Sequence, residues 1–205
     1  MLTSGKLLFL AGMARPNLSN SVRVLGRPAA SPCLRHWRGL QHVVRYLVRT
    51  TNIGLHYLRG RNNDHRRLLT GYADSDRAND SETRRSVTGY LLLFNGSPIV
   101  WRSKLQWSVT LSCSEAEWTA KAHGILHNIS IRGILAEMGI PQAATVRYGD
   151  NSGALQAAAI SAFNCRTKRV DIKLKCTRSY ITRGFVDVRF VPTTKILANI
   201  FTKCL

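Results

Sequence analysis

Apolar residues recur along this chain at the spacings of helices and strands. Over residues 36–50 they occur at i, i+3, i+4, i+7 and i+8, which predicts an amphipathic helix. The residues that follow this pattern are Leu40, Val43, Val44, Leu47 and Val48. Before this helix, residues 17–32 are rich in Ser, Pro, Arg and Asn, which predicts a loop, and after it residues 59–67 predict a polar connector.

From residue 68 onward the pattern changes to short strands separated by helices. Asn95-Gly96 predicts a hairpin turn between the second and third strands. The strands are expected at 68–74, 89–94, 99–102, 144–148 and 185–191. The helices are expected at 114–138, 151–160, 166–183 and 194–204. This order predicts an α/β fold, a mixed sheet flanked by helices, with a basic helical extension before it.

The charge is strongly basic and unevenly distributed. Thirty Lys and Arg residues against 11 Asp and Glu residues give a net charge of +19. Residues 1–68 contribute 12 basic residues and one acid, whereas residues 69–205 contribute 18 and 10. This excess favours a phosphate-rich partner such as nucleic acid, with an ordinary soluble basic surface as the alternative interpretation. No apolar run reaches the roughly 20 residues of a stable membrane span.

The five cysteines show no paired spacing. With no CxxC motif and an odd number, they predict neither a zinc site nor a disulfide framework. We expect small buried thiols in a protein that works in a reducing compartment.

Three acidic residues lie where predicted strands and helices meet. Asp74 ends the first strand, Glu117 lies in the first turn of the long helix, and Asp150 ends the fourth strand. If the fold gathers these carboxylates, they need cations, and Mg²⁺ prefers such oxygen ligands. Bound Mg²⁺ supports phosphodiester cleavage. The alternative is that all three are ordinary surface charges.

A series of motifs resembles the copia-type retrotransposon polyprotein, in the order found in that family. Six of them, from residue 71 to residue 203, resemble its ribonuclease H domain: GYADSD (71–76), TRRSVTGY (83–90), LSCSEAEW (111–118), GDN (149–151), RTK (166–168) and LANIFTK (197–203). Shorter ones resemble the tail of its reverse transcriptase: ARPN (14–17), HW (36–37), RYL (45–47) and TNIGL (51–55).

The resemblance implies a domain division and a metal site. Residues 69–205 are expected to form a ribonuclease H-like domain, and residues 23–68 a basic extension resembling the reverse transcriptase tail. In the family four acids bind Mg²⁺ and cleave RNA in RNA–DNA hybrids. The matching positions here are Asp74, Glu117 and Asp150, expected as catalytic and metal-binding residues, and Asn199 in place of the fourth acid.

Asn199 weakens the enzyme interpretation, because an Asn carbonyl can contact a metal ion but brings no negative charge. Other departures from the family pattern accompany it, at Arg77, Asn79, Arg169, Lys175 and Cys204. We expect a degenerate, inactive domain, with a residual Mg²⁺-dependent ribonuclease H as the alternative. The surviving acids would then be inherited residues without present use.

The N-terminus suggests a different class of function. Lys6 and the apolar stretch 7–14 are typical of a short signal peptide, so residues 1–22 are a candidate signal segment. Arg23, Val24, Leu25 and Gly26 resemble the degenerate RxLR motif of secreted oomycete effectors. This resemblance implies a secreted protein that enters the nucleus or cytoplasm of a host plant cell, binds a host protein and modulates defence or cell death.

The effector interpretation has alternatives at two levels. The stretch 7–14 is also typical of a helix in a larger parent protein, and the protein would then stay intracellular. Its function would then be that of the residual ribonuclease, or it would be a retrotransposon remnant with no role.

Overall fold

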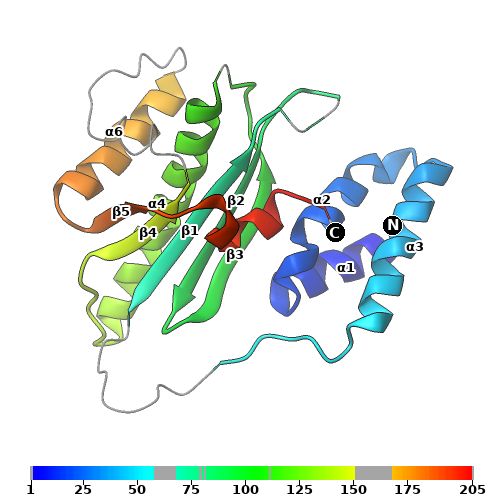
Figure 1. The fold of residues 1–205 in the computed structure, drawn as a ribbon, viewed down its shortest axis with the longest axis horizontal. Coiled ribbons are helices and arrows are strands. Elements are labelled where there is room, and N and C mark those ends of the chain that lie inside the picture. Colours follow the sequence, from blue (N-terminus) through cyan, green and yellow to red (C-terminus); the bar gives the residue numbers. More distant parts are fainter. Residues whose placement is uncertain are drawn as a thin grey trace.

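The computed structural model describes residues 2–57, 68–78, 80, 82–110, 112–150 and 168–204. Its centre is a five-stranded mixed sheet with helices against it, which confirms the α/β class (Figure 1). The strand order is β3-β2-β1-β4-β5. The strands are β1 Leu69–Asp76, β2 Val87–Phe94, β3 Ser97–Leu105, β4 Thr145–Gly149 and β5 Val186–Phe190.

Turn chemistry produces the antiparallel half of this sheet. Asn95 and Gly96 both have positive φ, 52° and 78°, which a tight two-residue hairpin requires, and they join β2 to β3 as expected. β1 pairs antiparallel with β2 on one side. On its other side β1 pairs parallel with β4, which pairs parallel with β5.

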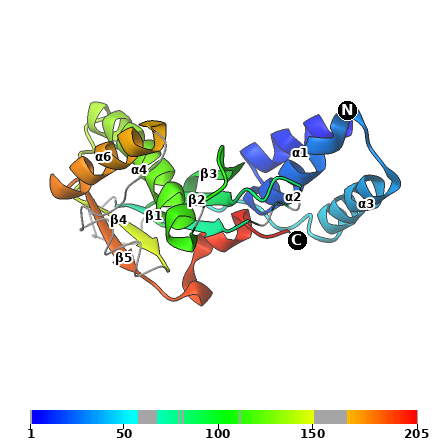
Figure 2. The same ribbon diagram turned by 90° about the horizontal axis from the view of Figure 1, so that it is seen from above.

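Helix α4, Cys113–Glu137, covers one face of the sheet, and α6, Lys168–Thr182, lies beside it on the same face and contacts β5 (Figure 2). Its N-cap is Ser112, whose hydroxyl accepts a hydrogen bond from Glu115 N. The expected start at residue 114 is therefore one residue late. Small buried residues such as Ala116 and Ala120 let α4 approach β1 and β2 closely. The predicted helix at 151–160 lies outside the described residues.

The C-terminal segment covers the opposite face, and the single helix predicted at 194–204 is wrong. Two short 3₁₀ helices are found instead, η3 Thr193–Lys195 and η4 Leu197–Phe201. Ile196 between them has φ −76° and ψ 105°, a conformation that ends helical hydrogen bonding. This break lets Ile196 and Phe201 both pack against the sheet, in a cluster with Leu91.

The N-terminal residues form a helical unit of their own. Its elements are α1 Leu2–Met13, η1 Pro16–Leu18, α2 Ser19–Gly26, η2 Arg27–Ala30 and α3 Leu34–Arg49. The loop predicted at 17–32 is wrong, because Leu18, Val22 and Leu25 are spaced i, i+4 and i+7 and pack in the core of this unit. The helix predicted at 36–50 is confirmed as α3, although Val44 and Val48 are exposed.

Direct contacts hold this helical unit against the sheet (Figure 1). Trp101 Nε1 on β3 donates to the backbone oxygen of Ala11, at 2.8 Å. Ser103, also on β3, donates to Asn20 Oδ1 at 3.2 Å. The candidate signal stretch therefore lies within a packed helix, and the expected boundary between residues 22 and 23 falls inside α2.

Two further findings concern the surface. Cys33, Cys113 and Cys204 are exposed, so the expectation of small buried thiols is wrong for these three. In the part of the chain that the structure describes, we find no helix with the length and apolar character that crossing a membrane requires.

Candidate metal centre

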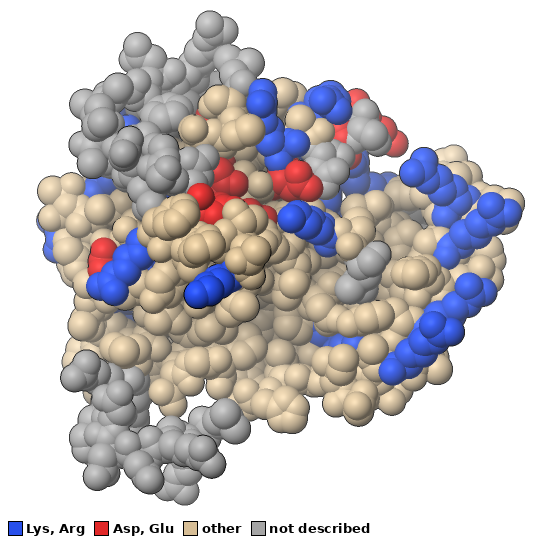
Figure 3. All heavy atoms as spheres, in the orientation of Figure 1, with Lys and Arg blue, Asp and Glu red and all other residues tan. Residues whose placement is uncertain are grey.

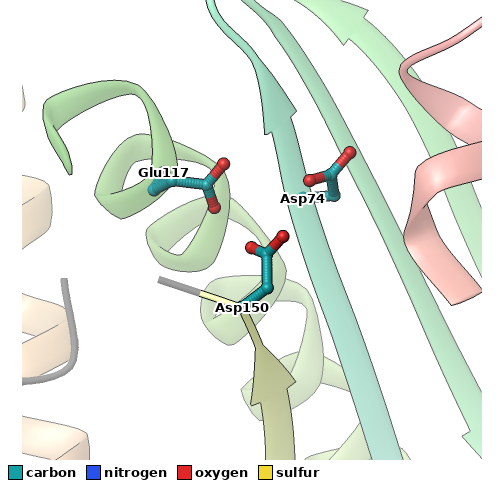
Figure 4. Close-up of side chains that lie close together, drawn as sticks. All are labelled: Asp74, Glu117 and Asp150. Atoms are coloured by element: carbon teal, nitrogen blue, oxygen red, sulfur yellow. The ribbon is translucent and has the colours of Figure 1, made fainter. Parts of the chain in front are cut away.

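The fold gathers the three predicted acids at one end of the sheet. Asp74 lies on β1, Glu117 on α4, and Asp150 directly after β4, and one oxygen of each lies within 4.8 Å of the others (Figure 4). Glu117 is the fifth residue of α4, just past the first turn in which it was expected.

Strand register explains why Asp74 and Asp150 meet. Tyr72 on β1 pairs with Tyr148 on β4, and their rings stack with centroids 5.1 Å apart. Because strand side chains alternate between faces, residues two positions further along each chain return to the same side. Asp74 and Asp150 occupy those positions, so the parallel pairing of two strands places two carboxylates side by side.

Glu117 approaches this pair from the helix layer. Its Oε1 accepts hydrogen bonds from Ser75 N at 3.0 Å and Ser75 Oγ at 2.7 Å. Its Oε2 is buried and has no hydrogen-bond partner among the described residues. Burial raises the pKa of Glu117 to about 7, against the lowering by Ser75. A buried carboxylate oxygen without a donor is costly, and a bound cation would remove that cost.

The C-terminal segment supplies hydroxyl groups to the other two acids. Thr202 donates to Asp74 Oδ2, and Thr193 donates to Asp150 Oδ2 at 2.8 Å. Burial raises the pKa of Asp74, and the bond from Thr202 opposes this rise. The two short 3₁₀ helices thus orient carboxylates that come from β1 and β4.

Asn199 stands on this same segment and bonds within it. Its Nδ2 donates to the backbone oxygen of Thr193, at 2.8 Å. The position expected for a fourth acid therefore contributes no charge and presents its amide to a neighbouring backbone group. Of the other departures from the family pattern, Arg77 directs its Nη1 to Cys113 Sγ, at 3.5 Å.

Lys121 is a residue of the site that the sequence analysis missed. It lies one turn after Glu117 on α4 and is only 3% exposed. Its charge acts on Glu117, Asp150 and Asp74. The signal was present in the sequence, since residues i and i+4 of a helix share a face. Figure 3 shows one group of acidic side chains near the centre of this face, with Lys and Arg side chains beside it, and other acids towards the left edge and upper right.

The RxLR-like residues lie away from this centre, in the last turns of α2. Arg23 donates to Asn20 Oδ1 through Nη2 at 2.7 Å and through Nε at 3.1 Å. Its Nε also lies 3.3 Å from Ser103 Oγ on β3. Leu25 packs against the core of the helical unit, whereas Val24 is exposed.

The donor set fits one hard divalent cation. Three carboxylates converge, and one of them has an oxygen with no hydrogen-bond partner among the described residues. These are the ligands that Mg²⁺ prefers. Bound there, Mg²⁺ would polarise a phosphodiester and lower the pKa of a water molecule.

The known proteins that this chain resembles in sequence include retrotransposon polyproteins and a secreted effector. No family model matches the chain. The Pol polyprotein of transposon TNT 1-94 from Nicotiana tabacum is 33% identical over 199 residues, 97% of this chain and 15% of the polyprotein. Secreted RxLR effector protein 161 of Plasmopara viticola is 42% identical over 116 residues, 57% of this chain and 79% of the effector. The chain thus spans a small part of the polyprotein and most of the effector.

Solved structures show the fold. The foamy viral protease-reverse transcriptase in complex with an RNA/DNA hybrid has a TM-score of 0.54 at 15% identity, covering 95% of this chain and 25% of that chain. The same viral protein in its dRH form with double-stranded DNA has a TM-score of 0.56 at 13% identity, covering 93% and 31%. The expected ribonuclease H-like mixed sheet is confirmed.

Proposed function

We propose, from the premise that this chain belongs to the family of copia-type retrotransposon Pol polyproteins, that it is a ribonuclease H-like domain with a weakened metal centre. The observation that carries the proposal is the cluster of Asp74, Glu117 and Asp150, with Asn199 where the resemblance implies a fourth acid. Such a site holds Mg²⁺ more weakly than four acids would, because one ligand charge is missing. Cleavage of RNA in an RNA–DNA hybrid is therefore slow or absent.

Each residue has a distinct part in this proposal. Asp74 and Asp150, oriented by Thr202 and Thr193, are the carboxylates that would hold the cation. Glu117, fixed by Ser75, would offer to the same ion its Oε2, which has no hydrogen-bond partner in the described part of the chain. The cation supplies the charge that activates water and stabilises the leaving oxygen.

A basic groove beside β3 supports nucleic acid as the partner. We call it the β3 groove; basic side chains and an exposed tryptophan line it, including Arg23, Arg85, Arg102, Lys104 and Trp107. Lys104 Nζ lies 5.3 Å from the centre of the Trp107 ring, which is itself 75% exposed. Cations of this kind bind backbone phosphates, and an exposed indole can stack on a base.

The groove lies at the same end of the sheet as the carboxylates. Gly89 on β2 pairs with Asp74 on one side and with Ser103 on the other. Two strand spacings therefore separate the groove from the metal centre, about 10 Å. A nucleic acid held in the groove has its backbone within reach of the three acids.

A cleavage assay tests the proposed function. We expect purified protein to cleave the RNA strand of an RNA–DNA hybrid negligibly in Mg²⁺. Asn199→Asp should raise both metal affinity and cleavage, because it adds a charge next to Thr193. Turnover at ordinary enzyme rates by the unaltered chain, abolished by Asp74→Asn, would refute the weakened centre.

A second candidate function is that of a secreted effector acting inside host plant cells. The likeness to secreted RxLR effector protein 161 favours it, because it covers 79% of that protein at 42% identity. In this account residues 1–22 direct export, and the chain then acts on a host protein or nucleic acid in the nucleus or cytoplasm. An inactive nuclease fold would serve as a binding scaffold.

A secretion assay tests the effector. Residues 1–20 should export a reporter, and Leu8→Asp with Phe9→Asp should block export by interrupting the apolar stretch. Both side chains are largely exposed in the folded protein, at 62% and 70%, so the same changes in the full chain spare its core. Asn17→Asp with Ser19→Asp is a control that adds the same two charges while leaving Lys6 and the apolar stretch intact. A reporter that stays inside the cell with the unaltered segment would contradict the effector role.

A further inference from the structure

A buried lysine, Lys121, lies close enough to the three carboxylates for its charge to act on them. Lys121 is among the few charged residues of the described chain that are almost fully buried. It extends from α4 on the side that carries Glu117. Burying an ammonium group is unfavourable unless negative charges surround it. Here Glu117, Asp150 and Asp74 provide them.

Packing against β4 fixes where the Lys121 chain ends. An ideal Cβ at Gly149 would lie 2.5 Å from Lys121 Cε and 2.9 Å from its Nζ. The ammonium end of the side chain therefore passes directly over the backbone of Gly149. Asp150 is the next residue, so this glycine is what lets the cation reach the carboxylate group.

We propose that Lys121 is a resident cation of the metal centre. Its positive charge neutralises part of the carboxylate charge that a divalent ion would otherwise neutralise, and this lowers the affinity of the site for that ion. This inference rests on the proposed function, since it takes the three carboxylates as the metal ligands. It locates the main weakness of the site at Lys121 rather than at Asn199. Lys121 is a positioning residue in this account, acting on the metal through Glu117, Asp74 and Asp150.

The positions of Lys121 and Asn199 make their effects on metal binding unequal. Lys121→Met and Asn199→Asp each make the site more negative by one charge. The buried position of Lys121 gives its charge little solvent screening, whereas Asn199 is partly exposed and bonds to the backbone of Thr193. Removing the buried cation should therefore have the larger effect on metal binding.

Direct metal binding tests the inference without reference to cleavage. The full chain is titrated with Mn²⁺, which reports bound and free ion by electron paramagnetic resonance. Lys121→Met should bind Mn²⁺ on the order of ten-fold more tightly than the unaltered chain, and more tightly than Asn199→Asp. Lys121→Arg, which keeps the charge, should stay close to the unaltered chain. Lys121→Gln serves as a second neutral variant if Lys121→Met does not fold, as judged by circular dichroism.

Lys203→Met is the matched control. Lys203 is exposed, and its charge also acts on Asp74. Its removal should change Mn²⁺ affinity by no more than about two-fold, because solvent screens it. A gain equal to that of Lys121→Met would show a general charge effect and overturn the inference.

Two other outcomes separate the inference from the proposed function. If neutral variants of Lys121 bind Mn²⁺ as the unaltered chain does, while Asp74→Asn still weakens binding, Lys121 is a structural residue and the metal centre stands. If Asp74→Asn changes nothing even in the Lys121→Met background, the carboxylates are not the metal ligands and both proposals fail.

Discussion

At the scale of single residues, Glu117 shows how the candidate metal centre opposes the stability of the fold. One of its oxygens is bonded to Ser75, while the other is buried without a hydrogen-bond donor among the described residues. Its pKa is raised to about 7 from 4.5, chiefly by burial. The folded state therefore holds the proton of Glu117 more tightly than the unfolded chain does.

This sets the sign of a pH effect. The contribution of Glu117 to the free energy of unfolding is fully present below about pH 4.5 and is lost as the pH rises through about 7. Without metal, Glu117→Gln should raise the free energy of unfolding at pH 8 by about 1–3 kcal/mol and change it little at pH 4.5. Urea unfolding at both pH values measures this. Glu137→Gln, at the exposed end of α4, is the control, and an equal gain from it would remove the explanation.

At the scale of elements, the C-terminal 3₁₀ segment links the core to the site. Phe201 and Ala198 pack against β2, and the next residue, Thr202, bonds to Asp74. Gly89 permits this approach, since a Cβ there would lie 2.8 Å from Phe201 Cβ and 2.9 Å from the oxygen of Ala198. A change in packing at Gly89 is therefore passed to the carboxylate on the neighbouring strand.

Gly89→Ala should cost about 1–3 kcal/mol of unfolding free energy, as overpacking of a core does. It should also weaken Mn²⁺ binding, because the displaced segment no longer orients Asp74. Gly133→Ala is the control: it lies within α4, and nothing surrounds the added carbon within 4 Å. That change should instead stabilise the protein by roughly 0.5–1 kcal/mol, and metal binding unaffected by Gly89→Ala would separate the segment from the site.

The same elements show which features of the fold and the site can be predicted from the amino-acid sequence. Strand ends placed Asp74 and Asp150 where strands and helices meet, but only the resemblance to the copia-type domain implied that they share one metal site. Asn95-Gly96 was enough for the hairpin. Local pattern did not predict the break at Ile196, because it arises from packing of both Ile196 and Phe201 on the sheet. It also did not predict α2, where burial of Leu18 and Val22 outweighs the low helix propensity of Ser and Asn.

At the scale of the whole molecule, some of the basic residues behind the net charge of +19 line a groove that the sheet and the helical unit form together. Arg23 comes from α2, and Arg102 and Lys104 come from β3, so the β3 groove requires both units to be in place. Deleting the extension would remove one wall of the groove and uncover the part of β3 that it packs against. Point substitutions are therefore the better test of nucleic-acid binding.

We expect salt-sensitive binding that is indifferent to nucleotide sequence. Arg102→Ala with Lys104→Ala should reduce the slope of log affinity against log salt by about 2, if each contacts one phosphate. Arg45→Ala with Arg49→Ala, on the exposed side of α3, removes the same charge elsewhere and should change the slope less. Fluorescence anisotropy with a labelled hybrid measures both. A larger loss from the α3 pair would place the contacts on the helical unit.

If residues 1–22 are an export signal, the bond from Trp101 to Ala11 sets export against folding for this segment. Cleavage inside that candidate signal segment, after Ala14 where the apolar stretch 7–14 ends, would take away the acceptor of Trp101 together with Leu7 and Ala11, two members of the helical core. An exported, trimmed chain would thus carry an uncovered indole and an opened three-helix unit, and would be a different protein from the one that folds with its first residues retained. Timing would then choose between them: a chain whose α1 docks on β3 before reaching the export machinery can no longer present its apolar stretch.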